Sequence, residues 1–494
     1  MANVANVDVP VTSPQAENGA ASARSRCEPL SLSAKVKFGL CAVISFHLAY
    51  EFAVCAPLIL LFLFCMFRLA HTATRREAMY LGWILGLLIY GPQLAFFWTI
   101  FGFGAIGLWL VLACWLCVYL MLQRFVLFKL PSPWAALSAP LLWTGLEYFR
   151  SELYPLRFSW LNVGYVFAPF PEAALLGVFG MYGVGFVLML VAAQFASRRR
   201  ILWGASLCAL VLVGHLFNAV NKARASPPPP TLRIAGVQLE MESEAVVLKA
   251  LDALKAKHPD AELLVLSEYA FESPVPPRVK DWCATHQRYL VAGGKHFLDA
   301  AEIRFHNTAF IIGPDGKEIF NQVKSVPVQF FKDGEPAAEQ KLWNSPWGKI
   351  GLCVCYDLSY TCVTDELVRQ GAEAIIAPTM DQQTWGGRQH RLHARVAPVR
   401  AAEYGIPIFR LCSSGISQAV DKHGNVIATA PFPGQGAMLE ATLLSPRRGS
   451  LPLDRLLAWP CVAISIFMLG WHIADSWRTR RKRLIPDNAN VSVS

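Results

Sequence analysis

The stretch IGLCVCYD, residues 350–357, is a run of apolar and small residues that ends at a tyrosine and an aspartate. A short apolar run of this length is typical of a buried β-strand. The residues after it predict a helix through Gln370 and another buried strand at Ala374–Ala377. Because strands alternate with helices, we expect an α/β layered domain in which helices cover a central sheet.

The same alternation extends toward the N-terminal side of this stretch. The expected elements are a strand at Leu232–Val237, a helix at Val246–Ala256, a strand at Leu263–Leu266, and a hairpin of Thr308–Ile312 and Lys317–Phe320 around Pro314-Asp315-Gly316. The α/β domain is therefore expected to cover residues 232–445. In such domains the chemistry is found where loops converge at the strand ends.

The rest of the chain is too apolar to be covered by water. Of the 494 residues, 54% are hydrophobic and only 16% are charged, whereas soluble domains have roughly 25% charged residues. Membrane-spanning helices need about 20 mostly apolar residues. Eight spans are expected, at Val36–Tyr50, Phe52–Leu69, Tyr80–Ile100, Gly104–Leu122, Pro133–Tyr148, Glu172–Ala196, Ile201–Asn218 and Leu456–Trp477. The first two are nearly continuous around Glu51, so seven spans remain an alternative.

The net charge of +10 comes from basic clusters beside these spans, such as Arg75-Arg76, Arg198–Arg200 and Arg478–Arg483. Basic residues next to spans mark the cytoplasmic side of a membrane protein, so this charge does not indicate a nucleic-acid partner. Eight spans place every strong basic cluster outside the α/β domain on one side of the membrane. Seven spans would break that agreement.

These observations divide the chain into six parts. They are a cytoplasmic N-terminal tail at 1–35, seven spans at 36–220, a proline-rich linker at 221–231, the α/β domain at 232–445, an eighth span at 456–477 and a basic cytoplasmic tail at 478–494. The N-terminal tail lacks the short apolar core of a cleaved signal peptide. With the N-terminus inside, the α/β domain lies on the non-cytoplasmic face.

Three residues with complementary chemistry each follow a predicted strand or hairpin: Glu268, Lys324 and Cys355. A thiol becomes a good nucleophile when a neighbouring base takes its proton. A carboxylate serves as that base, and a lysine stabilises the oxyanion of a tetrahedral intermediate. Spacing alone leaves ordinary structural roles open for all three. It also leaves Cys353 as an alternative to Cys355, because residues two apart on a strand share a face.

The order of motifs resembles the carbon–nitrogen hydrolase (nitrilase) superfamily throughout the α/β domain. The motifs are Glu268, His306-Asn307-Thr308-Ala309, Pro314-Asp315-Gly316, Lys324, Gly334-Glu335 and Cys355-Tyr356-Asp357. The segment Trp143–Phe186, with Glu147, Arg150, Trp160 and Tyr182, is similar to the bacterial apolipoprotein N-acyltransferases, the membrane branch of that superfamily. Trp385-Gly386, Gln389-His390, Arg400-Ala401, Glu403 and Arg410 fit the same family.

The resemblance implies an α/β domain built as a four-layer sandwich. It also implies that Cys355, rather than Cys353, is the acylated nucleophile, that Glu268 is the general base and that Lys324 stabilises the oxyanion. Glu335 and Tyr356 are implied as supporting residues of the active site. The family usually carries its second glutamate eight residues after the lysine, whereas Glu335 follows Lys324 by eleven.

The reaction implied by the resemblance transfers an acyl chain from a phospholipid, through a thioester on Cys355, to a lipoprotein. The acceptor is the α-amino group of its N-terminal diacylglyceryl-cysteine. The expected location is the cell inner membrane, with the α/β domain on the periplasmic side. No cofactor or metal is expected, and nothing in the sequence demands a second subunit, so a monomer is expected. The alternative is a membrane-tethered amidase that releases acid to water, and a non-enzymatic scaffold for lipoproteins is a third reading.

Other residues have two interpretations each. Glu147 and Arg150 contact a lipid headgroup or form an i,i+3 ion pair on a helix. Trp385, together with Phe330 and Phe331, lines an entrance for the acyl chain or simply packs in an apolar layer. His390 and His393 resemble a metal pair by spacing, but no third ligand follows at helical spacing.

Overall fold

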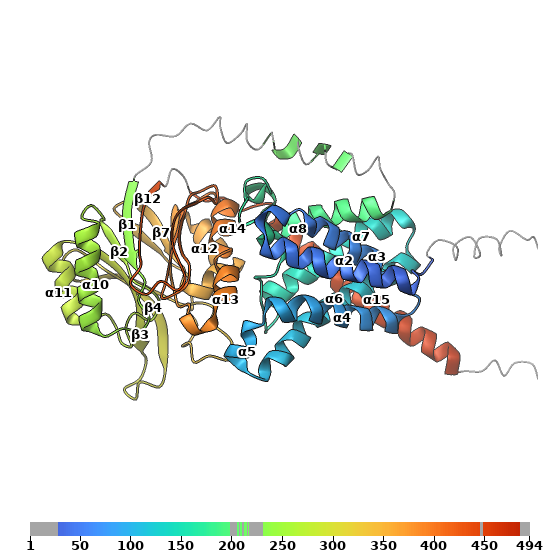
Figure 1. Ribbon diagram of the computed structural model, residues 1–494, viewed down its shortest axis with the longest axis horizontal. Coiled ribbons are helices and arrows are strands. Elements are labelled where there is room, and N and C mark those ends of the chain that lie inside the picture. The colour runs from blue at the N-terminus through green and yellow to red at the C-terminus, as the bar shows by residue number, and fades with distance from the viewer. Residues whose placement is uncertain are drawn as a thin grey trace, which may run out of the picture.

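The computed structural model describes residues 28–197, 231–444 and 448–484, together with several positions between 205 and 216. It has two parts, a helix bundle and an α/β domain, which lie at opposite ends of the long axis (Figure 1). The expected linker lies outside the described residues except for Thr231, and so does most of the expected seventh span at Ile201–Asn218.

The α/β domain is built on two six-stranded sheets. The first has the order β12 (Met438–Leu444), β1 (Thr231–Val237), β2 (Leu263–Val265), β3 (Tyr289–Phe297), β4 (Phe305–Ile312) and β5 (Glu318–Val323). The second has the order β11 (Val426–Ala430), β10 (Ser417–Val420), β9 (Ile408–Cys412), β8 (Ala374–Thr379), β7 (Gly348–Leu352) and β6 (Leu342–Ser345). In each sheet the three parallel strands, β1–β3 and β7–β9, are flanked by antiparallel ones.

Helices cover the outer faces of both sheets, which gives the expected four layers. Helices α10 (Glu244–Lys257) and α11 (Pro277–His286) lie beside the first sheet, and α12 (Thr361–Gln370), α13 (Gly387–His393) and α14 (Val396–Tyr404) lie beside the second (Figure 1). Alternate residues of a strand point to opposite faces. Leu264 accordingly packs with the residues of α10 and α11, while Leu263 and Val265 pack in the inner core. The strands and helices that the sequence predicts for the α/β domain are confirmed, with ends shifted by a few residues.

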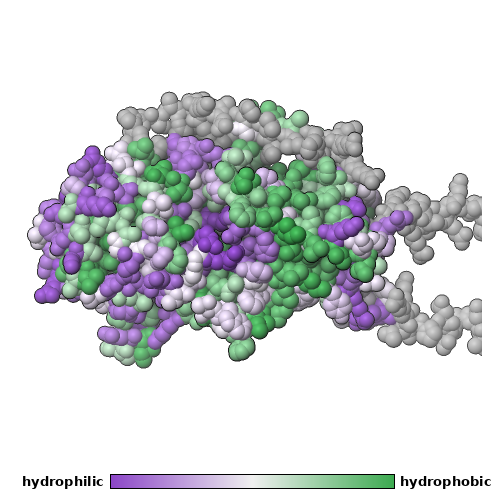
Figure 2. Space-filling view, in the orientation of Figure 1, coloured by the Kyte–Doolittle hydropathy of each residue, from purple (hydrophilic) through white to green (hydrophobic). Residues whose placement is uncertain are grey.

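The helix bundle supplies the apolar surface that the composition predicts. Its elements are α2 (Leu32–Glu51), η1 (Ala53–Cys55), α3 (Leu58–Leu69), α4 (Arg75–Gln93), α5 (Phe96–Phe101), α6 (Gly104–Lys129), α7 (Ser132–Tyr148), η2 (Phe149–Leu153), η3 (Val163–Phe167), α8 (Leu176–Ala196) and α15 (Asp454–Leu484). Among the described residues, α2, α6, α8 and α15 are long and apolar enough to cross a membrane. Hydrophobic side chains gather over the bundle, and hydrophilic ones gather over the α/β domain and the outer end of the bundle (Figure 2).

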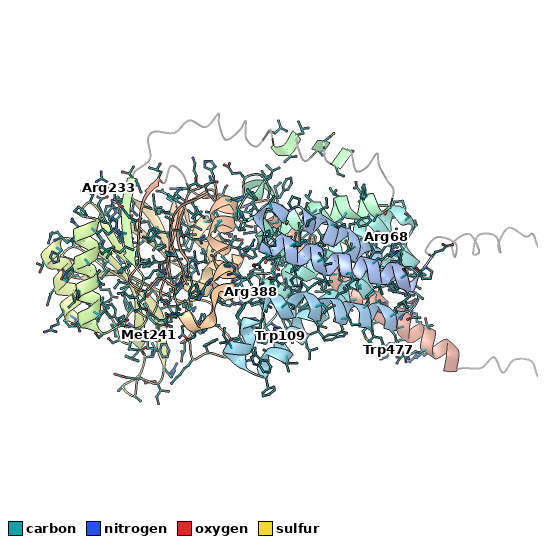
Figure 3. All side chains as sticks on the ribbon, in the orientation of Figure 1. Arg68, Trp109, Arg233, Met241, Arg388 and Trp477 are labelled. Carbon is teal, nitrogen blue, oxygen red and sulfur yellow. The ribbon has the colours of Figure 1, made fainter. Side chains whose placement is uncertain are left out.

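The end of the bundle remote from the α/β domain is basic. Arg68 and Trp477 lie at this end, far from Arg233 and Met241 of the α/β domain (Figure 3). Asp475 on α15 accepts from Arg75 at 2.9 Å and from Lys129 at 2.5 Å. Arg75 and Lys129, which follow the second and fourth expected spans, therefore meet at this end of the molecule.

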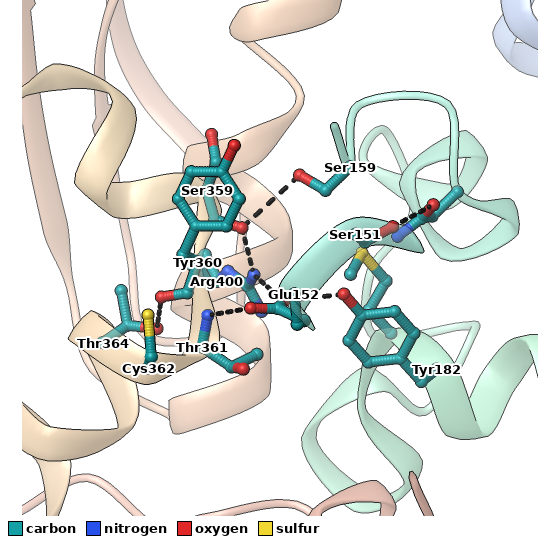
Figure 4. Close-up of polar contacts among 12 residues, drawn as sticks. Ser151, Glu152, Ser159, Tyr182, Ser359, Tyr360, Thr361, Cys362, Thr364 and Arg400 are labelled. Carbon is teal, nitrogen blue, oxygen red and sulfur yellow. Dashed lines mark hydrogen bonds and ion pairs between the residues drawn. The ribbon is translucent and has the colours of Figure 1, made fainter. Parts of the chain in front are cut away.

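Buried polar contacts join the bundle to the α/β domain (Figure 4). The carboxylate of Glu152, in η2, accepts from the backbone N–H of Thr361 at 3.0 Å and from the hydroxyl of Tyr182 at 2.6 Å. Arg400, fully buried in α14, donates to the carbonyl oxygen of Ser359 at 2.7 Å. Because Ser359 ends the turn that begins at Cys355, this network ties the predicted nucleophile to the bundle.

A kink in α8 completes this junction. Gly180 has φ +71°, so the helix restarts after it and the N–H groups of Met181 and Tyr182 have no partner within the helix. Glu403 of α14 accepts from Met181 at 2.6 Å, and Asp454 of α15 accepts from Tyr182 at 3.0 Å. Two carboxylates thus cap the second half of α8, one of them from the α/β domain.

Candidate active site

The three predicted catalytic residues lie together, although the chain separates them widely. Glu268 follows β2, Lys324 follows β5 and Cys355 follows β7. All three line one cavity of about 210 Å³. Glu268 and Lys324 are 1% exposed and Cys355 is 6% exposed. The facing edges of the two sheets therefore bring a carboxylate, an ammonium and a thiol into one buried space.

Glu268 is held by three hydrogen-bond donors. Its Oε1 atom accepts from Lys324 Nζ at 2.8 Å and from Asn307 Nδ2 at 2.6 Å. Its Oε2 atom accepts from the backbone N–H of Met380 at 2.7 Å. Burial nevertheless raises the pKa of Glu268, against the opposing effect of Lys324. A carboxylate with a raised pKa is a stronger base, which suits a group that takes a proton from a thiol.

Lys324 lies between two carboxylates. Its Nζ atom is 2.7 Å from Oδ2 of Asp333, in addition to the contact with Glu268. Burial alone lowers the pKa of Lys324, but Asp333 and Glu268 hold it well above its usual value. Burial likewise favours a neutral Asp333, but Lys324 keeps its pKa below the usual value. The lysine therefore carries a fixed positive charge inside the cavity.

Asp333 has further contacts that fix its position. Its Oδ1 atom accepts from Asn307 Nδ2 at 2.9 Å and from the Tyr269 hydroxyl at 2.8 Å. Its Oδ2 atom accepts from the backbone N–H of Val328 at 2.8 Å. Asp333 and Asn307 were not among the predicted site residues. The spacing from Lys324 could have indicated Asp333, because it follows Lys324 by nine residues and the family usually has its second glutamate eight residues after the lysine.

Cys355 has a backbone conformation that is rare for its residue type. Its φ of +52° lies in the left-handed region, which non-glycine residues seldom adopt. Asp357 stabilises this turn, since its carboxylate accepts from the backbone N–H groups of Val354, Ser325 and Val326 at 2.7 to 3.3 Å. The strand end that carries Cys355 is thereby tied to the loop that follows Lys324.

The thiol of Cys355 is protonated in this environment. Burial and the Glu268 carboxylate raise its pKa well above the usual value, although Lys324 opposes them. The Sγ atom donates to the carbonyl oxygen of Met380 at 3.7 Å. Cys353 is fully buried in the inner core and lines none of the cavities described here. The two cysteines that spacing left as alternatives are therefore placed very differently.

A second cavity meets the first at Cys355. It measures about 110 Å³ and is lined mainly by apolar side chains of α5, α6 and the loops that face them, including Phe97, Phe101 and Leu112. Trp385, Phe331 and Val328 line both cavities. Cys355 thus stands between a polar space, which holds Glu268 and Lys324, and an apolar space, which extends toward the helix bundle.

Three aromatic side chains lie at the meeting point of these cavities. Phe330 and Phe331 are 69% and 41% exposed, and both pack edge-on against Phe101 of α5. Trp385 is half-buried, with its ring 6.0 Å from that of Phe331. Tyr356 lines the apolar cavity and packs against Trp160. Phe330 and Phe331 therefore reach the surface beside the apolar cavity that they line.

Glu335 is not at the site, which corrects its expected position beside the triad. Its carboxylate is half-exposed and pairs with Arg304 at 2.6 Å. Arg304 lowers the pKa of Glu335, as expected for a surface ion pair. The second carboxylate at Lys324 is Asp333, because the chain turns at Gly334, where φ is +82°, and directs Glu335 outward.

Glu147 and Arg150 lie inside the helix bundle and bond different partners. Glu147 Oε1 accepts from the backbone N–H of Val163 at 2.9 Å, and Arg150 donates to the side chain of Asn162. Both line a separate cavity of about 30 Å³. They hold the loop that carries Trp160. Of the two readings of this pair, the i,i+3 ion pair is not formed, because Arg150 belongs to the π-helical turn Phe149–Leu153, where α-helical spacing fails.

His390 and His393 both lie beside Asp381. His393 Nδ1 is 2.8 Å from Asp381 Oδ1, whereas His390 Nδ1 is 3.9 Å from Oδ2. In the part of the chain that the structure describes, no three His, Cys, Asp or Glu side chains are arranged to hold a metal ion.

Comparisons with known proteins agree with the division into two parts. Residues 38–194 match the apolipoprotein N-acyltransferase N-terminal domain, and residues 233–445 match the carbon–nitrogen hydrolase family. The chain is 26% identical to the apolipoprotein N-acyltransferase of Azotobacter vinelandii, over 88% of this chain and 93% of that protein. It is 23% identical to that of Geobacter metallireducens, over 78% and 85%.

A solved structure of the nitrilase superfamily, Nit3 of Saccharomyces cerevisiae, matches 44% of this chain and 93% of its own at 20% identity and a TM-score of 0.38. The two family matches fall separately on the helix bundle and on the domain that holds Glu268, Lys324 and Cys355. The chain therefore belongs to the apolipoprotein N-acyltransferase family, a membrane branch of the carbon–nitrogen hydrolase superfamily.

Proposed function

We propose that this acyltransferase moves an acyl chain from a phospholipid, through a thioester on Cys355, to the α-amino group of the N-terminal diacylglyceryl-cysteine of a lipoprotein. Its relatives bear the name apolipoprotein N-acyltransferase, which supports N-acylation of lipoproteins. The observation that carries the proposal is the position of Cys355. It stands where an apolar cavity that extends toward the helix bundle meets the polar space of Glu268 and Lys324.

The first half-reaction forms the thioester. Glu268 takes the proton of the Cys355 thiol, and the sulfur attacks the ester carbonyl carbon of the phospholipid. The Lys324 ammonium stabilises the negative charge that develops on the carbonyl oxygen. The carbon–oxygen bond then breaks, and Glu268 returns the proton to the departing lysophospholipid alkoxide. Phe97, Leu112 and the other apolar side chains of the second cavity surround the acyl chain.

The second half-reaction transfers the acyl group. The neutral α-amino group of the acceptor attacks the thioester carbonyl carbon, and the carbon–sulfur bond breaks. Glu268 takes the proton that the amine loses and passes it to the Cys355 sulfur, which restores the thiol. The apolar lining keeps water away from the thioester, so the amine is favoured over hydrolysis. This property separates the proposed transferase from an amidase.

The bundle is proposed to lie in the cell inner membrane with eight spans and with the α/β domain on the periplasmic side. Support comes from the basic end of the bundle, which includes Arg68, Arg75 and Lys129 and lies opposite the α/β domain (Figure 3). Such clusters mark the cytoplasmic side. The aromatic residues Phe101, Phe330 and Phe331 then meet near the periplasmic surface of the inner membrane, where a lipid chain reaches Cys355. All three residues of the triad come from one chain, so a monomer suffices.

Mass spectrometry of lipoprotein N-terminal peptides tests this function. Cells without the gene are expected to make lipoproteins that lack one acyl chain, and the intact gene is expected to restore it. Purified enzyme mixed with phospholipid alone is expected to gain the mass of one acyl chain on the peptide that contains Cys355. Unchanged lipoproteins in the deletion strain would exclude the proposed acceptor, and rapid release of free fatty acid would favour the amidase.

A further inference from the structure

A second buried acid–base pair lies beside Cys355 and has no part in the triad. Asp381, just after β8, accepts from His393 Nδ1 at 2.8 Å through Oδ1 and from Arg410 at 2.6 Å through Oδ2. Gln389 donates to Oδ1 at 3.0 Å. Asp381, Gln389 and His393 line the apolar cavity together with Cys355. The negative charge of Asp381 acts on the thiol, because it helps to raise the pKa of Cys355 after burial and Glu268.

The contacts of Asp381 determine which nitrogen of His393 carries the hydrogen. Burial alone raises the pKa of Asp381, but His393 and Arg410 hold it well below its usual value. Asp381 is therefore an ionised carboxylate and only accepts hydrogen bonds, so the hydrogen lies on Nδ1 of His393. Burial lowers the pKa of His393 to about 4, against the opposing effect of Asp381. The imidazole is neutral at pH 7, and its Nε2 atom is a hydrogen-bond acceptor.

The Nε2 atom of His393 has no partner among the described residues, although the side chain is 1% exposed. Trp160 stacks on the imidazole at 4.5 Å with an interplanar angle of 19°. This stacking fixes the ring plane and therefore the direction in which Nε2 accepts a hydrogen bond. A buried acceptor without a partner is costly, which indicates a site where a donor from a substrate binds.

The two substrates of the proposed reaction differ in what they offer to such an acceptor. At its reacting centre a phospholipid ester has only oxygen atoms that accept hydrogen bonds. The attacking amine of the acceptor carries N–H donors. We propose that His393 is the residue that recognises the amine, by accepting a hydrogen bond from it at Nε2 while the thioester on Cys355 is attacked. This inference rests on the proposed function and adds to it the residue that selects an amine.

The proposed contact leaves the balance of the transfer step unchanged. The amine nitrogen forms its bond to the thioester carbonyl carbon as the carbon–sulfur bond breaks. One N–H of the amine donates to His393 Nε2 throughout. Glu268 takes the proton of another N–H and returns it to the Cys355 sulfur. His393 orients the lone pair of the amine toward the carbonyl carbon and neither gains nor loses a proton.

Measuring the two half-reactions separately on the full-length enzyme tests this role. The variants are His393→Met, which removes the acceptor, and His393→Gln, whose side-chain oxygen lies near the position of Nε2. Arg391→Gln, at an exposed position on the same helix, is the matched control. The first measurement is the rate at which Cys355 gains an acyl chain from phosphatidylethanolamine in detergent. The second is the rate at which the isolated acyl-enzyme transfers that chain to a diacylated lipopeptide.

In His393→Met, thioester formation is expected to stay within about threefold of wild type, and transfer to the lipopeptide is expected to fall about 10- to 100-fold. His393→Gln is expected to recover most of the transfer rate. Slow hydrolysis of the acyl-enzyme without acceptor is expected to be unchanged. Equal losses in both half-reactions, or an unchanged transfer rate, would overturn the proposal. A wild-type enzyme that forms no thioester, or transfers nothing, would instead refute the proposed function.

Discussion

The Nζ atom of Lys324 lies 2.7 Å from Oδ2 of Asp333 and 2.8 Å from Oε1 of Glu268, so the two carboxylates share one buried positive charge. This sharing affects the base as well as the lysine. The negative charge of Asp333 raises the pKa of Glu268, whereas Lys324 lowers it. The negative charge of Asp333 therefore offsets part of the effect of Lys324 and keeps Glu268 a stronger base.

Asp333→Asn is expected to slow formation of the Cys355 thioester about 10- to 100-fold, since Lys324 then pairs with Glu268 alone and makes it a weaker base. The thioester is measured by intact mass after mixing with phospholipid. Glu335→Gln is the control, because Glu335 pairs with Arg304 at the surface. It is expected to change the rate by less than about twofold. Equal effects of the two variants would contradict the assignment of Asp333.

Cys355→Ala is expected to fold normally and to gain no acyl mass from phospholipid, because the attacking sulfur is gone. Cys353→Ala is the informative partner, since Cys353 is buried in the inner core and faces no described cavity. It is expected to lose about 1 to 2 kcal/mol of stability through the small void it leaves, and to keep thioester formation. An acylated Cys355→Ala protein would refute the role of Cys355.

As the pH decreases, the rate of thioester formation is expected to fall at a higher pH than it would with an ordinary glutamate as the base. Glu268 must be ionised to take the thiol proton, and burial raises its pKa. The acid limb is therefore expected above about pH 4.3, the value for a free glutamate. Lys324 stays protonated on the alkaline side, because Asp333 and Glu268 hold its pKa well above its usual value. Initial rates between pH 4 and 9 show where the acid limb lies and whether the rate holds on the alkaline side. An acid limb at or below the pKa of a free glutamate would contradict the role of Glu268 as the base.

Much of the catalytic arrangement could be predicted from strand ends. Glu268 and Cys355 each follow a short buried parallel strand, and catalytic residues are often found in the loops at such strand ends. Because β2 and β7 belong to different sheets, the packing of the two sheets brings these residues together, and strand ends alone do not predict it. The motif order then assigned the roles. For the second carboxylate, the family spacing of eight residues is nearer to Asp333, nine residues after Lys324, than to Glu335, eleven after it. A turn at Gly334 determines which of the two side chains faces Lys324, and spacing does not reveal that turn.

Two further features depend on contacts that no local pattern reveals. The relation of Glu147 to Arg150 changes because the helix widens into a π-turn at Phe149–Leu153, and α-helical spacing then misplaces Arg150. The pairing of His393 with Asp381 joins a helix to the end of β8, so the spacing between His390 and His393 carried no information about it. In both cases tertiary packing determines the partner.

Gly180→Ala is expected to destabilise the junction between the bundle and the α/β domain. The added Cβ would lie 2.3 Å from the carboxylate of Asp454, and φ at Gly180 is +71°. Strain of this kind costs about 1 to 3 kcal/mol. Gly107→Ala on α6 is the control, because nothing lies within 4 Å of its added Cβ. A helical alanine there is expected to be neutral or stabilising. Thermal unfolding of the detergent-solubilised protein measures both, and equal midpoints would refute the role of the kink.

Filling the apolar cavity is expected to shorten the acyl chain that the enzyme accepts. Leu112 on α6 is 3% exposed and lines that cavity, so Leu112→Trp places an indole where the chain would lie. Thioester formation from phospholipids with chains of 16 to 18 carbons is expected to fall about tenfold or more, because overfilling a packed space costs about 1 to 3 kcal/mol. Short-chain phospholipids are expected to react nearly as fast as with wild type. Leu110→Trp, an exposed position on the same helix outside the cavity, should leave this chain-length profile unchanged. If Leu112→Trp slowed all chain lengths equally, the apolar cavity would not be the place where the acyl chain binds.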